Sequence, residues 1–153
     1  MKYALITGSS KGIGKAMAES LAKRKYNVLL VARSEKLLQS LAVEIKQKYN
    51  VDAKWIAIDL SKTDAATEVK NWVTQNNFPV SILINNAGYG LWGNFHELAL
   101  EDQNNMLQLN VFTLVNLTYL MIPVLILQPK SYILNTGSMA GLQSIPTLNL
   151  YAA

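Results

Sequence analysis

A glycine-rich segment near the start of the chain could bind the phosphates of a nucleotide. Residues 7–14 read TGSSKGIG, directly after the apolar run Tyr3–Ile6 and directly before apolar residues at helical spacing. Glycine tolerates positive φ and lets a backbone approach a ligand, and a helix N-terminus presents free N–H groups to an anion. An ordinary tight turn is the alternative, but the strand–loop–helix context favours a dinucleotide site. The candidate ligands in this segment are Gly8, Ser10, Lys11, Gly12, Ile13 and Gly14.

The residues after the second predicted strand bear on which dinucleotide would bind. In such folds an acidic residue at this point bonds the ribose of NAD, whereas a nearby arginine meets the 2′-phosphate of NADP. The strand ends Val31-Ala32-Arg33-Ser34, with no carboxylate and with a guanidinium suited to phosphate. Lys11 could add a second positive charge. We therefore expect NADP(H) rather than NAD(H), the alternative being that Arg33 and Lys11 are solvated surface residues.

Six features occur along the chain in a characteristic order and spacing: TGSSKGIG at 7–14, DL at 59–60, NNAG at 85–88, Asn110, Ser138 and Tyr151. In these features the chain resembles the short-chain dehydrogenase/reductase family over essentially its whole length. This resemblance implies that Asp59 and Leu60 flank the adenine, and that Asn86, Ala87 and Gly88 line the adenosine side. The NNAG segment can also be read as a polar turn that stabilises the sheet, and both readings can hold.

The same resemblance implies hydride transfer between a nicotinamide and a carbonyl or alcohol substrate, with Tyr151 as the proton donor. Ser138 would bond the substrate oxygen, and Asn110 would hold a water in the proton relay. A tyrosine can serve near neutral pH only if its pKa falls from about 10. In the family a lysine ammonium four residues after the tyrosine lowers that pKa.

The sequence ends at Ala153, two residues after Tyr151, so it does not reach the position of that lysine. We therefore expect residues 1–153 to be a single, truncated NADP-binding Rossmann domain that lacks the C-terminal strands and turns over at background. Two alternatives remain open. The chain could be a catalytically dead NADP(H)-binding module, or the remnant of a truncated reading frame.

Short apolar runs alternate with amphipathic segments, and this order must position the residues above. Strands that alternate with helices imply a parallel sheet, in which ligands bind beyond the carboxyl ends of the strands. We predict an α/β fold, a Rossmann-type doubly wound sheet of about five strands in the order 3-2-1-4-5. The predicted strands are 3–6, 28–31, 55–58, 82–84 and 132–134, and a long helix is predicted from about Leu100 to about Met121.

Composition excludes several other functions. The chain has no cysteine and one histidine, His96, which excludes disulfides and thiolate or multi-histidine metal sites. The net charge of +4 comes from dispersed residues, so no nucleic-acid partner is expected. The partner we expect is a small carbonyl or alcohol substrate. Met1-Lys2 leads straight into a strand without a signal-like segment, so we expect a cytoplasmic protein.

The run Val111–Leu127 is nearly long enough to span a bilayer, but it contains Asn116, two threonines and Pro123. A helix that is apolar on all sides is more often buried between protein surfaces, so we expect no membrane role. The fifth strand should form an exposed edge, which favours association. We expect a homo-oligomer through the long helix near 100–121, the fifth-strand edge, or both.

Overall fold

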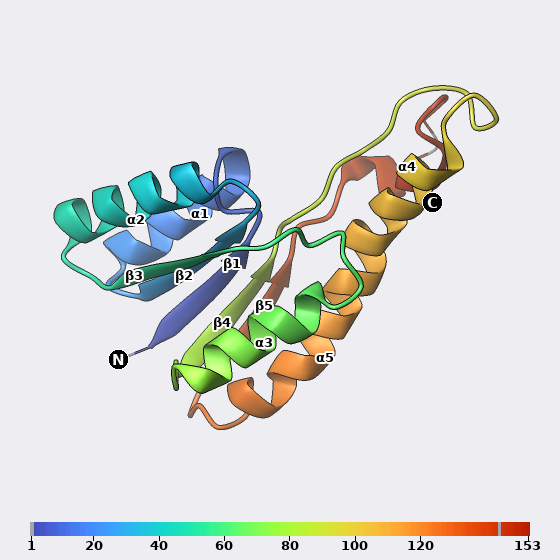
Figure 1. Ribbon diagram of the computed structural model, residues 1–153. Coiled ribbons are helices and arrows are strands. Elements are labelled where there is room, and N and C mark those ends of the chain that lie inside the picture. The colour runs from blue at the N-terminus through green and yellow to red at the C-terminus, as the bar shows by residue number, and fades with distance from the viewer. Residues whose placement is uncertain (1, 144) are drawn as a thin grey trace.

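The computed structural model describes residues 2–143 and 145–153, which form one sheet with helices on both faces (Figure 1). The strands are β1 (Tyr3–Thr7), β2 (Asn27–Ala32), β3 (Ala53–Ala57), β4 (Val80–Asn85) and β5 (Tyr132–Asn135). The α-helices are α1 (Gly12–Lys23), α2 (Glu35–Tyr49), α3 (Ala65–Gln75), α4 (Leu100–Leu107), α5 (Leu114–Leu125) and α6 (Asn149–Ala152). Two further segments are the π-helix η1 (Gln108–Thr113) and the 3-10 helix η2 (Met139–Gly141).

The five strands are parallel and lie in the order β3-β2-β1-β4-β5, which confirms the predicted Rossmann-type architecture. Helices α1 and α2 cover one face, and α3 and α5 cover the other (Figure 1). The order reverses between β1 and β4, so the loops after these strands diverge at the carboxyl edge. That divergence is where a doubly wound sheet opens a crevice for a ligand.

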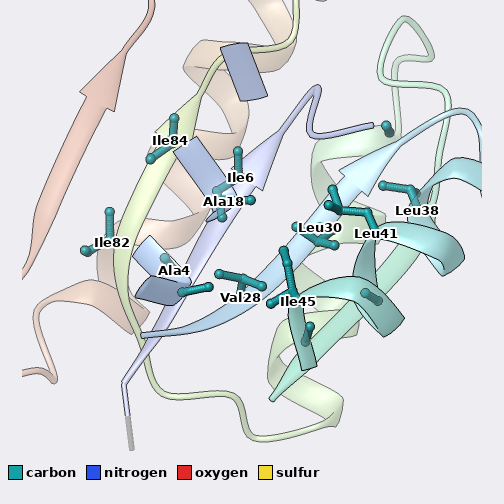
Figure 2. Close-up of a cluster of buried hydrophobic side chains, with 14 residues drawn as sticks. Ala4, Ile6, Ala18, Val28, Leu30, Leu38, Leu41, Ile45, Ile82 and Ile84 are labelled. Atoms are coloured by element: carbon teal, nitrogen blue, oxygen red, sulfur yellow. The ribbon is translucent and has the colours of Figure 1, made fainter. Parts of the chain in front are cut away.

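The first core lies between the sheet and α1 and α2 (Figure 2). Ile6 from β1 and Leu30 from β2 are fully buried there, and they meet Ala18 of α1 and Leu38 of α2 in one cluster. The small Ala18 lets α1 lie close to the sheet, while the larger side chains come from the strands and α2. This packing holds the start of α1 beside the end of β1.

The second core uses the other residues of the same strands. Leu5 and Leu29 alternate with the residues of the first core and pack against Val69 of α3 and Leu117 of α5. Burial on both faces explains why β1, β2 and β4 read as continuous apolar runs instead of alternating patterns. It also fixes the register of each strand, because a slip of one residue would exchange the two cores.

Several predicted boundaries were wrong. The fourth strand is Val80–Asn85 rather than 82–84. The third strand is Ala53–Ala57 rather than 55–58, because its pairing with β2 begins at Ala53 opposite Val28. The long helix runs on past Pro123 to Leu125, and its middle is the π-helix η1. Apolar content marked these elements, but the hydrogen-bond partners set their ends.

The helical run Leu100–Leu125 is long and apolar enough to span a bilayer, and only 17% of its most apolar stretch is buried. One side of α5 packs on the sheet through Leu117, Met121 and Leu125. Its other side is exposed, as are all four residues of the edge strand β5. The expected core-or-interface helix is therefore buried on one side only, and the expectation of no membrane role stays a prediction.

Candidate active site

A cleft of about 930 Å³ lies at the carboxyl ends of the strands. Its walls come from the loops after all five strands, from η1 and from α6. A cleft of this size suits a cofactor together with a small substrate. Every site residue predicted from sequence lines it except Gly14: Gly8, Ser10, Lys11, Gly12, Ile13, Arg33, Asp59, Leu60, Asn86, Ala87, Gly88, Asn110, Ser138 and Tyr151.

The structure gives different reasons for the presence of glycine at the three glycine positions of the loop after β1. A Cβ on Gly8 would lie 2.8 Å from the Cα of Ala87, and one on Gly14 would overlap the Gly8 carbonyl oxygen. These two positions are closed by protein atoms. Gly12 has φ +57°, yet a Cβ there would meet nothing within 4 Å. Gly12 therefore presents backbone to open space in the cleft.

The N-terminus of α1 is suited to an anion. No side chain caps it, and its first turn contains no acidic residue. The free N–H groups and the helix dipole therefore face the cleft without a competing negative charge. Lys11 and Ile13 are exposed beside these groups. This loop could hold the diphosphate of a dinucleotide.

The NNAG segment is bound to the end of β1 by several hydrogen bonds. The backbone amides of Asn86 and Ala87 donate to Thr7 Oγ1 at 2.9 and 3.0 Å, and Asn86 Nδ2 donates to the Thr7 carbonyl at 3.0 Å. Thr136, after β5, donates to Asn86 Oδ1 at 3.4 Å. The reading of this segment as a turn that stabilises the sheet is supported, and the segment also lines the cleft.

Opposite charges stand at the far end of the cleft, after β2 and β3. Partial burial acts to raise the pKa of Asp59, but hydrogen bonds from the Ser61 hydroxyl and amide, with the charges of Arg33 and Lys62, hold that pKa below its ordinary value. Asp59 is thus ionised at neutral pH. Arg33 is exposed and forms no ion pair with a described residue. Its guanidinium is available to a phosphate.

Asn110 lies in the π-helix, and its amide is already engaged. Oδ1 accepts from the Tyr89 amide at 3.2 Å, and Nδ2 donates to the Tyr89 carbonyl at 2.8 Å. This pair fastens η1 to the loop after β4. Asn110 Oδ1 keeps a second lone pair, so it can still accept a hydrogen bond from a water.

Ser138 and Tyr151 reach the cleft from the segment after β5. The Ser138 hydroxyl accepts a hydrogen bond from the Ala140 amide at 3.1 Å, which caps η2 and holds the serine at the cleft. Tyr151 lies in α6 and is half-buried. The cation–aromatic contacts among the described residues join Lys48 to Tyr49 and Lys130 to Tyr132, so neither involves Tyr151. Within residues 2–143 and 145–153, no group of side chains is arranged to hold a metal ion.

Sequence reasoning missed two residues that build the site. Thr7 joins β1 to the NNAG segment, and Tyr89 provides the backbone groups that hold Asn110. Tyr89 also lines the cleft, where burial, with the negative charge of Asp102, raises the pKa of its hydroxyl. Thr7 stands inside the TGSSKGIG segment and could have been found there. Tyr89 contributes through its backbone, which no residue type signals.

Comparisons with known proteins identify the family of this chain. A model of the short chain dehydrogenase family matches residues 2–153. The chain is 33% identical over 156 residues to the very-long-chain 3-oxoacyl-CoA reductase of Mus musculus, covering 99% of this chain and 49% of the relative. It therefore spans about half the length of the curated relatives that it matches.

Solved structures show the same fold. The L-sorbose reductase of Gluconobacter frateurii, complexed with NADPH and L-sorbose, has a TM-score of 0.93 and 31% identity; the match covers 99% of this chain and 57% of that one. A short-chain dehydrogenase from Sphingobium yanoikuyae, in complex with NADPH, has a TM-score of 0.91 and 29% identity, with 99% and 59% covered.

Proposed function

Because this chain belongs to the short chain dehydrogenase family, we propose that it forms the cofactor-binding and proton-donating part of an NADP(H)-dependent oxidoreductase. The substrate is a carbonyl compound or the corresponding alcohol. The observation that carries the proposal is the single cleft that brings together the glycine loop, Arg33, Ser138 and Tyr151. These elements come from opposite ends of the chain, and no local requirement of folding explains their meeting.

The residues fit the cofactor. The uncapped N-terminus of α1 and the open backbone at Gly12 take the diphosphate, and Arg33 and Lys11 take the 2′-phosphate. Asp59 has one carboxylate oxygen engaged with Ser61, which leaves the other for the adenine edge. Arg33 and Lys11 can both contact the 2′-phosphate of NADP(H), which NAD(H) lacks, so these two cations favour NADP(H).

A bound NADPH would supply the hydride that the carbonyl carbon accepts. Ser138 donates a hydrogen bond to the carbonyl oxygen and so orients the substrate. Tyr151 gives its hydroxyl proton to that oxygen as negative charge develops there, and the product is the alcohol. The phenolate regains a proton from solvent through a water held at Asn110. Alcohol oxidation runs through the same groups in reverse.

The cofactor preference can be tested by nucleotide titration. We expect NADPH to bind residues 1–153 more tightly than NADH. Arg33→Ala should weaken NADPH binding by roughly 10- to 100-fold, because a charge-assisted contact with phosphate is worth about 1.5–3 kcal/mol. NADH binding should change little. Fluorescence or calorimetric titration of both nucleotides measures the two constants.

Lys36→Ala is the matched control, since Lys36 is an exposed cation in the first turn of α2. It should leave the preference intact. Equal affinity of the unmodified chain for NADH and NADPH would contradict the NADP(H) assignment. The binding experiment needs no substrate and is independent of turnover.

Residues 1–153 by themselves should reduce carbonyl compounds only at background. The reason is that, among the described residues, no lysine or arginine stacks on the Tyr151 ring, so no cation of the described chain is placed to stabilise a phenolate there. NADPH oxidation can be followed with a reactive diketone and with a 3-oxoacyl thioester, the latter suggested by the relatives' names. Robust turnover would refute the need for a further cation, whereas NADPH binding without turnover agrees with a cofactor-binding module.

The proposal includes a second copy of this chain as a partner. The exposed side of the long helix carries an apolar stripe of Val111, Val115, Tyr119, Ile122 and Ile126. Their spacing of three or four residues places them on one helix face. The edge strand β5 exposes further apolar side chains: Tyr132, Ile133 and Leu134. A stripe of this kind is typical of helix pairing between subunits.

A further inference from the structure

The segment that leads into Tyr151 is docked on the loop after β4. The Gly93 amide donates to the Thr147 carbonyl at 3.0 Å, and Asn149 Nδ2 donates to the Gly93 carbonyl at 2.6 Å. The backbone amide and carbonyl of Gly93 are thus both hydrogen-bonded to residues of the segment just before Tyr151. Because the two segments are more than fifty residues apart in sequence, this contact is tertiary and not part of a local turn.

The backbone at this contact adopts conformations that are costly by themselves. Thr147 has φ +69° and Asn149 has φ +41°. A β-branched residue such as threonine is rarely found in the left-handed region, and such strain persists only where the surroundings hold it. Gly93 has φ +153°, and a Cβ there would lie 2.9 Å from Leu98 Cδ2. The two residues with positive φ thus lie in the segment that hydrogen bonds tie to Gly93.

A second glycine of the loop receives the tyrosine ring itself. A Cβ on Gly90 would lie 3.2 Å from Cγ of Tyr151 and 3.4 Å from Cδ1. The ring thus packs directly on the Gly90 backbone. Gly90 is exposed, and its φ lies in a range that any residue can adopt. The structural reason for glycine at this position is therefore the space that the Tyr151 ring occupies.

We propose that the loop Gly90–Gly93 holds the catalytic Tyr151 in position, with Gly90 and Asn149 as positioning residues. Gly90 sets the depth of the Tyr151 ring, and Asn149 fixes the start of α6 by its bond to Gly93. This inference rests on the proposed function, in which Tyr151 gives its proton to the substrate. A proton donor must stand within hydrogen-bond reach, and a misplacement of about 1 Å can cost about 100-fold in rate.

A double-mutant cycle in the natural full-length protein tests whether this loop positions Tyr151. Gly90→Ala should lower kcat several-fold while the Kd for NADPH stays unchanged, because a Cβ 3.2 Å from the Tyr151 ring displaces that ring by a few tenths of an ångström. Tyr151→Phe should lower kcat at least as much. In the Tyr151→Phe background, Gly90→Ala should cause no further loss, because there is no hydroxyl left to misplace. Additive losses would overturn the proposal, since they would mean general damage to the fold.

Asn149→Asp tests the hydrogen bond, because aspartate keeps the size and the tolerance of positive φ but cannot donate to the Gly93 carbonyl. It should lower kcat by a similar factor. Asn71→Asp makes the same chemical change on the exposed face of α3 and should leave kcat unaltered. A normal kcat in Asn149→Asp would overturn the role of Asn149.

Hydrogen exchange gives a readout that needs no turnover. The Tyr151 amide donates to the Leu148 carbonyl at 2.9 Å, within the docked segment. Its exchange should quicken in Asn149→Asp and stay slow in Asn71→Asp; equal rates would overturn the docking. Failure of the proposed function looks different, because full activity in Tyr151→Phe alone would remove the tyrosine's role whatever the exchange data show.

Discussion

At the scale of residues, the glycines of the loop after β1 meet two different requirements, close packing and an accessible backbone, which a sequence pattern does not distinguish. Gly8 and Gly14 are small because the NNAG segment and the loop's own carbonyl lie against them. Gly12 has free space and a positive φ, so its backbone alone is available to a ligand. A motif match treats the three alike. The structure gives a packing reason for two of them and leaves the third open to solvent.

Gly14→Ala should lower the free energy of unfolding by roughly 1–3 kcal/mol, because its Cβ would overlap the Gly8 carbonyl and the backbone must shift. Gly141→Ala is the control, since a Cβ there meets nothing within 4 Å and φ is ordinary. Urea unfolding followed by circular dichroism measures both. Equal stabilities of the two variants would show that the loop adjusts without cost.

At the scale of elements, the π-helix η1 is the feature that brings the long helix to the cleft. Asn110 ties it to the loop after β4, and Thr113 Oγ1 donates to the Leu60 carbonyl at 2.7 Å. Thr113 is buried, so this bond also satisfies the backbone carbonyl of Leu60, a residue that lines the cleft. The sequence showed a long apolar helix but not this interruption, because a π-turn depends on contacts with Tyr89 and Leu60.

Thr113→Val should destabilise the fold by about 1–3 kcal/mol, because valine keeps the shape of threonine and leaves the buried Leu60 carbonyl without its donor. Thr74→Val makes the same change at an exposed position of α3, where the hydroxyl only bonds its own helix. It should alter stability by less than about 0.5 kcal/mol. The comparison of their urea midpoints decides, and matching midpoints would show that the Thr113 bond contributes nothing net.

At the scale of the whole molecule, the apolar surface is unevenly covered. Helices α1, α2 and α3 bury their apolar faces, whereas one side of α5 and all of β5 are exposed. The same helical run is long enough to span a bilayer. The absence of a membrane role and the cytoplasmic location therefore remain predictions, and cell fractionation of the natural protein checks both.

Residues 1–153 should form a dimer or higher oligomer in light scattering, and Tyr119→Glu should shift them toward monomer by placing a charge in the apolar stripe. Tyr119 is 75% exposed, so the substitution should not disturb the core. Leu37→Glu is the matched control on α2, where an apolar side chain is also exposed. Monomeric behaviour of the unmodified chain would contradict the interface.

The sequence by itself determined the α/β class, because buried strands read as apolar runs that alternate with amphipathic helices. With the resemblance to short-chain dehydrogenases, it also predicted the strand order and about half of the residues that line the cleft. The glycine loop and Arg33 carry their chemistry in their residue type, so their roles could be predicted without coordinates.

Only the tertiary structure decided how these residues are held. The end of β3, the π-turn at Asn110 and the docking of Asn149 on Gly93 each depend on a partner that is distant in the chain. Residue type does not reveal such a partner, because the contact is made by a backbone carbonyl or made possible by the absence of a side chain. For the same reason, the space that Gly90 leaves for Tyr151 becomes visible only when both segments are in place.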